Sequence, residues 1–210
     1  METKFVISEV LKKSWECTKS QLGILIGLWI GFLILGTLLG FTSIALRDSI
    51  VGMFIYVIAS MAFSFAFILG YIKNIFQALD GMEPQFSAYS QQAHKIVPFF
   101  AASLIACVIV SIGFVFLIIP GFYLYYRLMF FPAFIIEEDA GAIESLKKSW
   151  EITRGQVLPL FTLSLVMCGI CLLGYILLIV GVFIAIPLIY MMYAETFRRL
   201  NVPPTVIEEL

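Results

Sequence analysis

The sequence predicts an all-α membrane protein, a bundle of six transmembrane helices with amphipathic helices at the cytoplasmic interface. Composition is the first observation: 61% of the 210 residues are hydrophobic and 13% are charged, about half the charge of a soluble domain. Long uncharged stretches are the second, and a charged segment that occurs twice is the third. The chain is interpreted as a single transmembrane domain, 1–210. Its net charge of −1 gives no reason to expect a nucleic-acid partner.

Four long stretches with almost no charge set the number of spans, because a helix needs roughly 20 apolar residues to cross the hydrocarbon core. Two of them, 20–46 and 49–72, each fit one helix and form a hairpin that turns at Arg47 and Asp48. The other two, 96–136 and 155–194, are each about twice a spanning length and must fold back once. The sequence therefore predicts six helices, at approximately 22–46, 50–78, 97–119, 121–137, 156–179 and 182–200.

Proline and glycine predict where the two longer stretches reverse. The sequence IIPG at 118–121 should turn the chain, because Pro120 lacks an amide for helix continuation and Gly121 tolerates the reversal. Aligning VFLIIPGFYLYY with YILLIVGVFIAI places Gly181 opposite Gly121. The second reversal is therefore expected at Gly181.

Basic residues predict the orientation, because Lys and Arg flank the cytoplasmic ends of membrane spans. With six spans, the far side of the membrane receives only Arg47, whereas the side of the two termini receives the flanking Lys and Arg residues. Both termini are therefore expected in the cytoplasm, in a bacterial inner membrane. The charged N-terminal segment is not typical of a signal peptide, so the first span is expected to stay uncleaved.

The duplicated segment reads LKKSWECTKSQ at 11–21 and LKKSWEITRGQ at 146–156. With Glu9 and Glu144 included, nine of thirteen positions are identical. On a helix, each copy has one apolar stripe and an opposite face of charges spaced four residues apart, which should form pairs. Each copy is predicted to lie along the cytoplasmic interface before turning into a span. The expected pairs are Glu9–Lys13, Lys12–Glu16, Glu144–Lys148 and Lys147–Glu151, and the expected anchors are Trp15, Trp150, Lys12, Lys13, Lys147 and Lys148.

A third, weaker copy is also predicted. VPFFAASL at 97–104 matches LPLFTLSL at 158–165, and at the same offset Tyr89 falls opposite Trp150. Tyr89 would then be a further interfacial anchor. The chain divides into repeat units of about 1–81, 82–139 and 140–210, each an interfacial helix followed by a hairpin. The alternative is a chance similarity between two apolar stretches.

The stretch IPGFYLYYRLMFFPAFIIEEDAGAIESLKKSWEITRG, 119–155, resembles the membrane domain of the bacterial glycerophosphoryl diester phosphodiesterase family and related uncharacterised multi-pass families. The resemblance extends over essentially the whole chain and implies a multi-pass membrane module. The phosphodiesterases join this domain to a catalytic barrel, which is not expected here, so the resemblance implies no reaction. The residues that carry it are Pro120, Gly121, Arg127, Glu137, Ser149, Trp150, Thr153 and Gly155.

Arg127 most strongly suggests a functional site, because a charge near the middle of a span is costly and usually faces the protein interior or a wet cavity. Its expected partner is Glu195, the only carboxylate well inside a span. The two residues are expected to line a polar cavity between the fourth and sixth helices. Alternatively, Arg127 belongs to a buried pair that fixes helix packing, or extends to an interface.

Other patterns predict little chemistry. No catalytic group, metal or cofactor is expected, because the chain has one histidine and its four cysteines lie in apolar or helical surroundings. Gly23, Gly27 and Gly31 form a face of small residues that is typical of close helix contact, within the bundle or with a second copy or partner protein.

Two functions fit these features. The first is a non-enzymatic membrane protein that organises lipid or docks a partner. The second is a small transporter or pore with a polar site around Arg127. A continuous wet cavity would favour transport, whereas apolar grooves filled by acyl chains would favour lipid organisation. An enzyme would need clustered acids, bases or metal ligands in such a cavity.

Overall fold

The computed structural model describes residues 3–201, and of residues 178–180 it describes the backbone alone. Within that range the chain is helical and contains no strand, as the all-α prediction requires. The elements are α1 (Ile7–Leu46), α2 (Ile50–Leu79), α3 (Ser87–Gln91), the 3-10 helix η1 (Ala93–Lys95), α4 (Ile96–Phe116), α5 (Ile118–Leu128), α6 (Phe131–Glu138), α7 (Ala142–Ile152), α8 (Val157–Ile176) and α9 (Leu178–Leu200).

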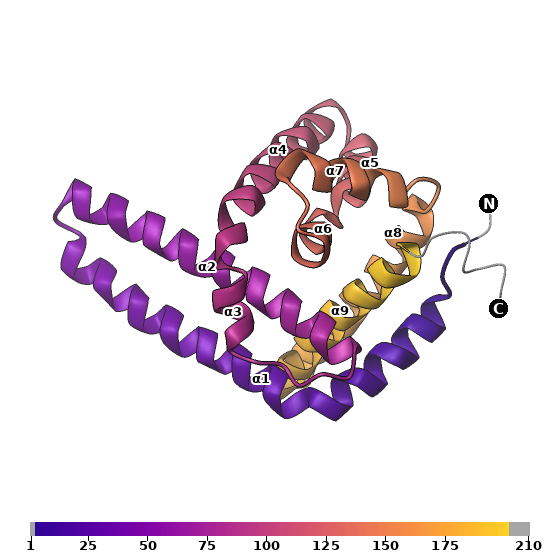
Figure 1. Ribbon diagram of the computed structural model, residues 1–210, viewed down its shortest axis with the longest axis horizontal. Coiled ribbons are helices and arrows are strands. Elements are labelled where there is room, and N and C mark those ends of the chain that lie inside the picture. The colour runs from indigo at the N-terminus through magenta and orange to yellow at the C-terminus, as the bar shows by residue number, and fades with distance from the viewer. Residues whose placement is uncertain (1–2, 202–210) are drawn as a thin grey trace.

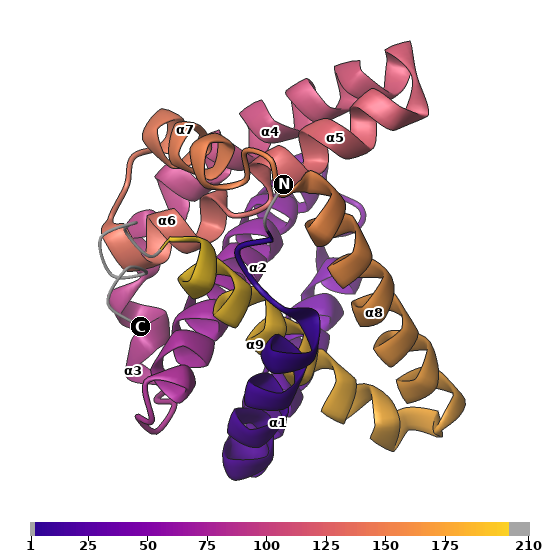
Figure 2. The ribbon, with the colours of Figure 1, turned by 90° about the vertical axis from the view of Figure 1, so that its right-hand side faces the viewer.

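Three helical hairpins extend from one shared region. In Figure 1 the hairpin of α1 and α2 extends to the left, and in Figure 2 the hairpins of α4–α5 and α8–α9 extend to the upper right and lower right. We call the shared region the base. It consists of α3, η1, α6, α7 and the adjoining residues 5–21, 67–79 and 188–201.

The hydrophobic core lies mainly in the base. Phe76 of α2, Phe134 of α6 and Phe197 of α9 are all buried there. The ring centre of Phe197 lies 5.6 Å from that of Phe76 and 4.9 Å from that of Phe134. Because three helices from distant parts of the sequence meet at these rings, burial of this cluster holds the hairpins together.

Among the described residues, five helical segments are long and apolar enough to cross a membrane: Ile7–Leu46, Ile50–Leu79, Ala93–Phe116, Ile118–Glu138 and Val157–Ile176. This agrees with the predicted series of membrane-length apolar segments. The count of six spans stays a prediction, since α9 is not among the five.

The fourth predicted span, 121–137, is not one continuous helix. The chain leaves helical order at Met129 and Phe130, between α5 and α6. Pro132, in the first turn of α6, has no amide to continue the preceding helix. In addition, Tyr193 donates a hydrogen bond to the Met129 carbonyl at 3.1 Å. The segment is long and apolar enough to span, as predicted, but these contacts hold a break in its helix that hydropathy alone does not show.

The two chain reversals occur at equivalent positions, but not at the predicted glycines. The breaks lie at Leu117, between α4 and α5, and at Leu177, between α8 and α9. These two leucines are opposite each other in the alignment that pairs Gly121 with Gly181. The alignment was therefore informative, although the turns precede the glycines by four residues.

Pro120, Gly121 and Gly181 each act inside the helix that follows a reversal. Pro120 lies in the first turn of α5. Backbone amides in a first turn have no partner within the helix, so the lack of an amide hydrogen in proline breaks no hydrogen bond there. Gly121 packs on the ring of Phe114 and Gly181 packs on Gly174, so neither position has room for a side chain. The glycines therefore allow the two helices of each hairpin to approach closely, which corrects their predicted role as turn residues.

The two copies of the repeated segment fold differently. The second copy forms α7, which ends at Ile152 and is followed by Gly155 at a φ of 77°, a conformation that favours glycine. The first copy has Ser20 at this position and stays within α1 without a break. Figure 1 shows that α1 instead bends along its length. The prediction of a separate helix is therefore right for the second copy and wrong for the first.

Candidate functional site

Arg127 lies in the last turn of α5 and is covered by aromatic side chains. Its guanidinium carbon lies 4.2 Å from the ring centre of Trp150 and 5.9 Å from that of Tyr123. A desolvated contact of this kind stabilises by about 2 kcal/mol. Arg127 is only 3% exposed, and its Nε and Nη1 find no hydrogen-bond partner among residues 3–201. The guanidinium is therefore held by aromatic rings, with two donor nitrogens unused.

The repeated motif secures the backbone beside this arginine. Ser149 Oγ donates to the Arg127 carbonyl at 3.0 Å and accepts from the Phe130 amide at 3.1 Å. Thr153 Oγ1 lies 3.1 Å from the same carbonyl and 2.7 Å from that of Ser149. Because α5 ends here, these backbone groups lack partners within the helix. Ser149, Trp150 and Thr153 thus hold the end of α5 together.

The predicted pair between Arg127 and Glu195 is wrong. Glu195 is buried in the base, where its carboxylate lies 2.9 Å from Lys13 Nζ and 2.8 Å from Arg199 Nε. Arg199 also pairs with Glu9 at 2.7 Å. The prediction assumed that the fourth and sixth spans run alongside each other. Instead, α5 ends beside α7, whereas α9 packs along the N-terminal part of α1.

A second set of ion pairs joins α2, α6 and α9 in the base. Glu137 pairs with Lys73 at 2.9 Å and with Arg198 at 2.7 Å. Arg198 also reaches Asp80, at 3.0 Å. Since these groups come from three helices, the charges of the base connect the hairpins to one another in addition to the apolar core.

Lys95 of η1 is the most deeply buried lysine of the base, with 5% of its surface exposed. Its Nζ pairs with Asp139 at 2.5 Å and donates to the Ile136 carbonyl at 2.9 Å. The hydrogen bond from Lys95 lowers the pKa of the Asp139 carboxyl below its ordinary value. Lys95 therefore ties η1 to the end of α6.

Within each copy of the repeat, the two neighbouring lysines have different surroundings. Lys13 pairs with Glu195, and Lys148 pairs with Glu144 at 2.8 Å. Lys148 also reaches Glu138, at 3.0 Å. By contrast, Lys12 and Lys147 are exposed, and the described structure gives neither of them an ion pair. In both copies the second lysine binds the protein and the first remains free for the surroundings.

Only one of the four predicted pairs within the copies forms, Glu144–Lys148. The pair of Glu9 with Lys13 is replaced by contacts of both residues with α9. Between residues 3 and 201, no ion pair joins Lys12 to Glu16 or Lys147 to Glu151. These predictions were wrong because partners on neighbouring helices compete with the four-residue spacing.

The three predicted aromatic anchors have different surroundings. Trp15 is 45% exposed and Trp150 is 38% exposed, so each keeps free surface. Tyr89 packs on Gly70 of α2, which leaves no room for a side chain at Gly70. Tyr89 is therefore better described as the residue that fastens α3 to α2.

The glycine face of α1 is uncovered. A Cβ atom placed on Gly23, Gly27 or Gly31 would meet no atom within 4 Å in the described structure. The face therefore does not serve close packing inside the bundle. Contact with a second copy or a partner protein stays a prediction.

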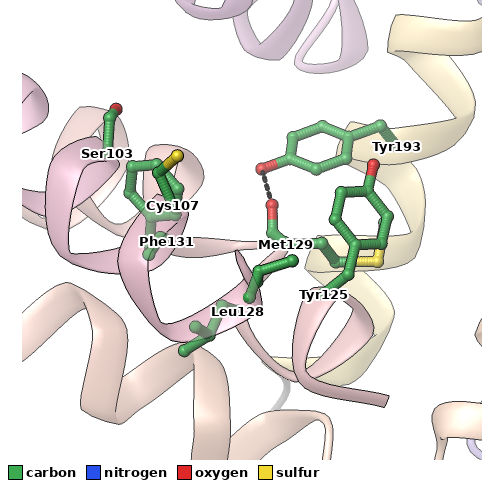
Figure 3. Close-up of a pocket in the computed structure, with 9 residues that line it drawn as sticks. Ser103, Cys107, Tyr125, Leu128, Met129, Phe131 and Tyr193 are labelled. Carbon is green, nitrogen blue, oxygen red and sulfur yellow. Dashed lines mark hydrogen bonds between the residues drawn. The ribbon is translucent and has the colours of Figure 1, made fainter. Parts of the chain in front are cut away.

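A cavity of about 360 Å³ lies beside the break between α5 and α6 (Figure 3). Tyr125 of α5 and Tyr193 of α9 line one side of it, and residues of α4 line the other. Neither Arg127 nor Glu195 lines this space, so the predicted polar cavity between them does not form here. Its volume and walls suit an apolar group. The lining residues are Ser103, Ala106, Cys107, Val110, Tyr125, Leu128, Met129, Phe131 and Tyr193.

Comparison with known protein families gives a match over most of the chain. The model of a family described as a domain of unknown function, DUF7847, matches residues 49–208. This region contains Arg127, the second copy of the repeat and Glu195, whereas the first copy precedes it. No curated protein and no solved structure matches the chain.

Proposed function

Because the chain belongs to DUF7847, a family of unknown function, we propose its function from its own geometry: a non-enzymatic integral membrane protein that organises lipid around three hairpins. The observation that carries the proposal is the uncovered apolar surface of those hairpins. Phe54 is 66% exposed, Val115 84% and Tyr175 78%. Contiguous apolar surface of this kind is rare on soluble proteins and is stable in hydrocarbon.

The base is proposed to lie at the cytoplasmic interface of a bacterial inner membrane, with both termini on that side. Trp15 and Trp150 support this placement, because exposed indoles favour the headgroup region. The free lysines Lys12 and Lys147 supply positive charge at the same level. Such lysines attract anionic headgroups by about 1 kcal/mol each. The predicted resemblance to the phosphodiesterase membrane domain is compatible with this role.

The cavity of Figure 3 supports lipid rather than a polar solute as the occupant. Its polar groups are few, and the Tyr193 hydroxyl already donates to the Met129 carbonyl. Cavities of roughly 300–1,000 Å³ with mostly apolar walls are typical of sites for apolar ligands. We therefore assign this space to part of an acyl chain.

Electron paramagnetic resonance on reconstituted protein tests the proposal. Spin-labelled phosphatidylglycerol should be immobilised in preference to spin-labelled phosphatidylcholine. The double variant Lys12→Gln/Lys147→Gln should lose that preference. The matched control, Lys13→Gln/Lys148→Gln, removes the same charge from the same segments but should keep the preference and lower stability instead. Wild-type protein without a preference, or protein that alkaline carbonate extracts from membranes, would contradict the proposal.

A small transporter or pore is the second candidate, and the unused donors of Arg127 favour it. Two buried guanidinium nitrogens without partners could take an anionic group if Trp150 moved aside. In liposomes loaded with small anions, this function requires flux that the variant Arg127→Leu abolishes without unfolding the protein. Equal flux in wild type and variant would exclude it.

A further inference from the structure

We propose that the tips of the α4–α5 and α8–α9 hairpins end within the hydrocarbon of the membrane, whereas the tip of the α1–α2 hairpin reaches the water on the far side. This inference rests on the proposed membrane function and adds where each hairpin stops. The partner of the two tips is therefore lipid acyl chains.

The three tips differ in polarity. The α1–α2 tip contains Arg47 and Asp48, whose side chains are 71% and 91% exposed. The α4–α5 tip lies within a stretch without any charged residue, 96–126, and the α8–α9 tip lies within another, 155–194. A turn that emerges into water or headgroups normally carries polar residues, as the first tip does. The other two tips lack them.

The side chains at the two apolar tips are exposed and large. Five consecutive residues around the break at Leu117 are between 68% and 84% exposed. At the other tip, Tyr175, Ile176 and Leu177 are between 68% and 78% exposed. Water at these positions would forfeit the free energy of burying each side chain, whereas hydrocarbon would not. The five residues are Val115, Phe116, Leu117, Ile118 and Ile119.

The backbone reverses at each tip within a very short break. Each break is a single residue long, and the Leu117 amide donates to the Gly113 carbonyl at 3.1 Å. The Leu177 amide likewise donates to the Leu173 carbonyl at 3.0 Å. Pro120 removes one amide from the first turn of α5, where it would have no partner. A one-residue break with a paired amide thus exposes fewer polar backbone groups than a longer turn would, which favours a position in hydrocarbon.

The directions of the hairpins limit how deep the tips reach. The 21 residues of α4 make a helix of about 31 Å, which equals the thickness of the hydrocarbon core, about 30 Å, only if the helix stands upright. The three hairpins extend from the base in different directions (Figures 1 and 2), so they cannot all stand upright. By contrast, the 40 residues of α1 provide length to spare.

Fluorescence quenching tests the depth of each tip. In a background with the four native cysteines replaced, the variants Leu117→Cys, Leu177→Cys and Asp48→Cys are labelled with bimane in detergent and reconstituted. Lipids brominated deep in their acyl chains should quench the probes at 117 and 177 severalfold more than aqueous iodide does. Iodide should instead quench the probe at 48, which serves as the internal control.

The outcomes separate this inference from the proposed function. Iodide quenching at 117 or 177 in protein that resists carbonate extraction would overturn the depth assignment alone. Absence of quenching by both agents would also overturn it, because the tips would then be covered by protein, such as a second copy. Extraction of the protein by carbonate would overturn the membrane function itself.

Discussion

Segments 9–21 and 144–156 share nine of thirteen residues, yet one is part of a 40-residue helix and the other belongs to an 11-residue helix that ends before Gly155. The comparison shows how little of a segment's role its own residues decide. Ser149 and Thr153 bind the backbone beside Arg127, while the equivalent Ser14 and Thr18 are buried and find no hydrogen-bond partner among the described residues. The equivalent hydroxyls are therefore expected to contribute differently to stability in the two copies.

The two copies also differ in their ion pairs. The first copy is fastened by its charges, because Glu9 and Lys13 pair with α9. The second copy is fastened mainly by the hydroxyls and the ring of its motif, because its pair between Lys148 and Glu144 lies at the surface. Removal of charge should thus damage the first copy more, and removal of hydroxyls the second.

The largest effect is expected for Glu195→Ala. Lys13 and Arg199 would lose a carboxylate that is 3% exposed, and breaking a buried pair costs about 3 kcal/mol. The free energy of unfolding in detergent, followed by circular dichroism during denaturant titration, measures this. The control Glu138→Ala breaks the equivalent attachment of Lys148, which is about one-third exposed, and should cost about 0.5 kcal/mol. Equal losses of unfolding free energy in the two variants would contradict the expected difference between the two copies.

Ser149→Ala should come next. It leaves the buried Phe130 amide and Arg127 carbonyl with fewer partners, at a cost of about 2 kcal/mol. Ser14→Ala should be neutral or slightly stabilising, because that hydroxyl is buried without a partner. The same unfolding titration compares the two variants. A larger loss for Ser14→Ala would show that the first copy hides a hydrogen bond, through water for example.

Gly155→Ala should have a smaller effect, about 1 kcal/mol of destabilisation, because alanine is strained at a φ of 77°. The matched change in the first copy, Ser20→Ala, should stabilise by about 0.5 kcal/mol, since Ser20 lies within a helix. Opposite signs in thermal unfolding midpoints are therefore expected. Destabilisation by both changes would mean that residue 20 also needs a special conformation.

The smallest effect is expected from the surface pair of the second copy. The hydrogen bond from Lys148 lowers the pKa of Glu144 below its ordinary value of about 4.5, so both groups are charged at neutral pH. The contribution of this pair is present above about pH 4.5 and is lost as pH falls through the lowered pKa. Comparing stability at pH 7 and pH 4 in wild type and Glu144→Gln measures it. A loss of stability in Glu144→Gln as large as that in Glu195→Ala would contradict the expected order of effects.

Hydropathy and the repeat predicted much of the fold, but not its connections in the base. The ends of α2 came within one residue of the prediction because uncharged length and a polar turn define them directly. The break between α5 and α6 was missed because its support comes from Ser149 and Tyr193, which are distant in sequence. The partner of Glu195 was missed for the same reason.

Site residues were predicted unevenly. Arg127, Trp150 and Gly155 stand out in the sequence, since an arginine in an apolar stretch and a conspicuous repeat are local signals. Lys95 gave no such signal, because a lysine outside the apolar stretches is usually exposed, yet it is buried against the end of α6. Burial of that kind depends on which helices meet, and periodicity within one segment does not report it.

The pairing of α1 with α9 also depends on the order in which the chain is synthesised. Glu9 and Arg199 are 190 residues apart, so at synthesis rates of about 5–20 residues per second the ribosome needs roughly 10–40 seconds to supply the partner. Until then, the newly made Glu9 and Lys13 must remain solvated, while under the proposed membrane function the later hairpins enter the bilayer one after another. The base can close only after Arg199 has been synthesised, which under the proposed membrane function places its assembly after the insertion of the earlier hairpins.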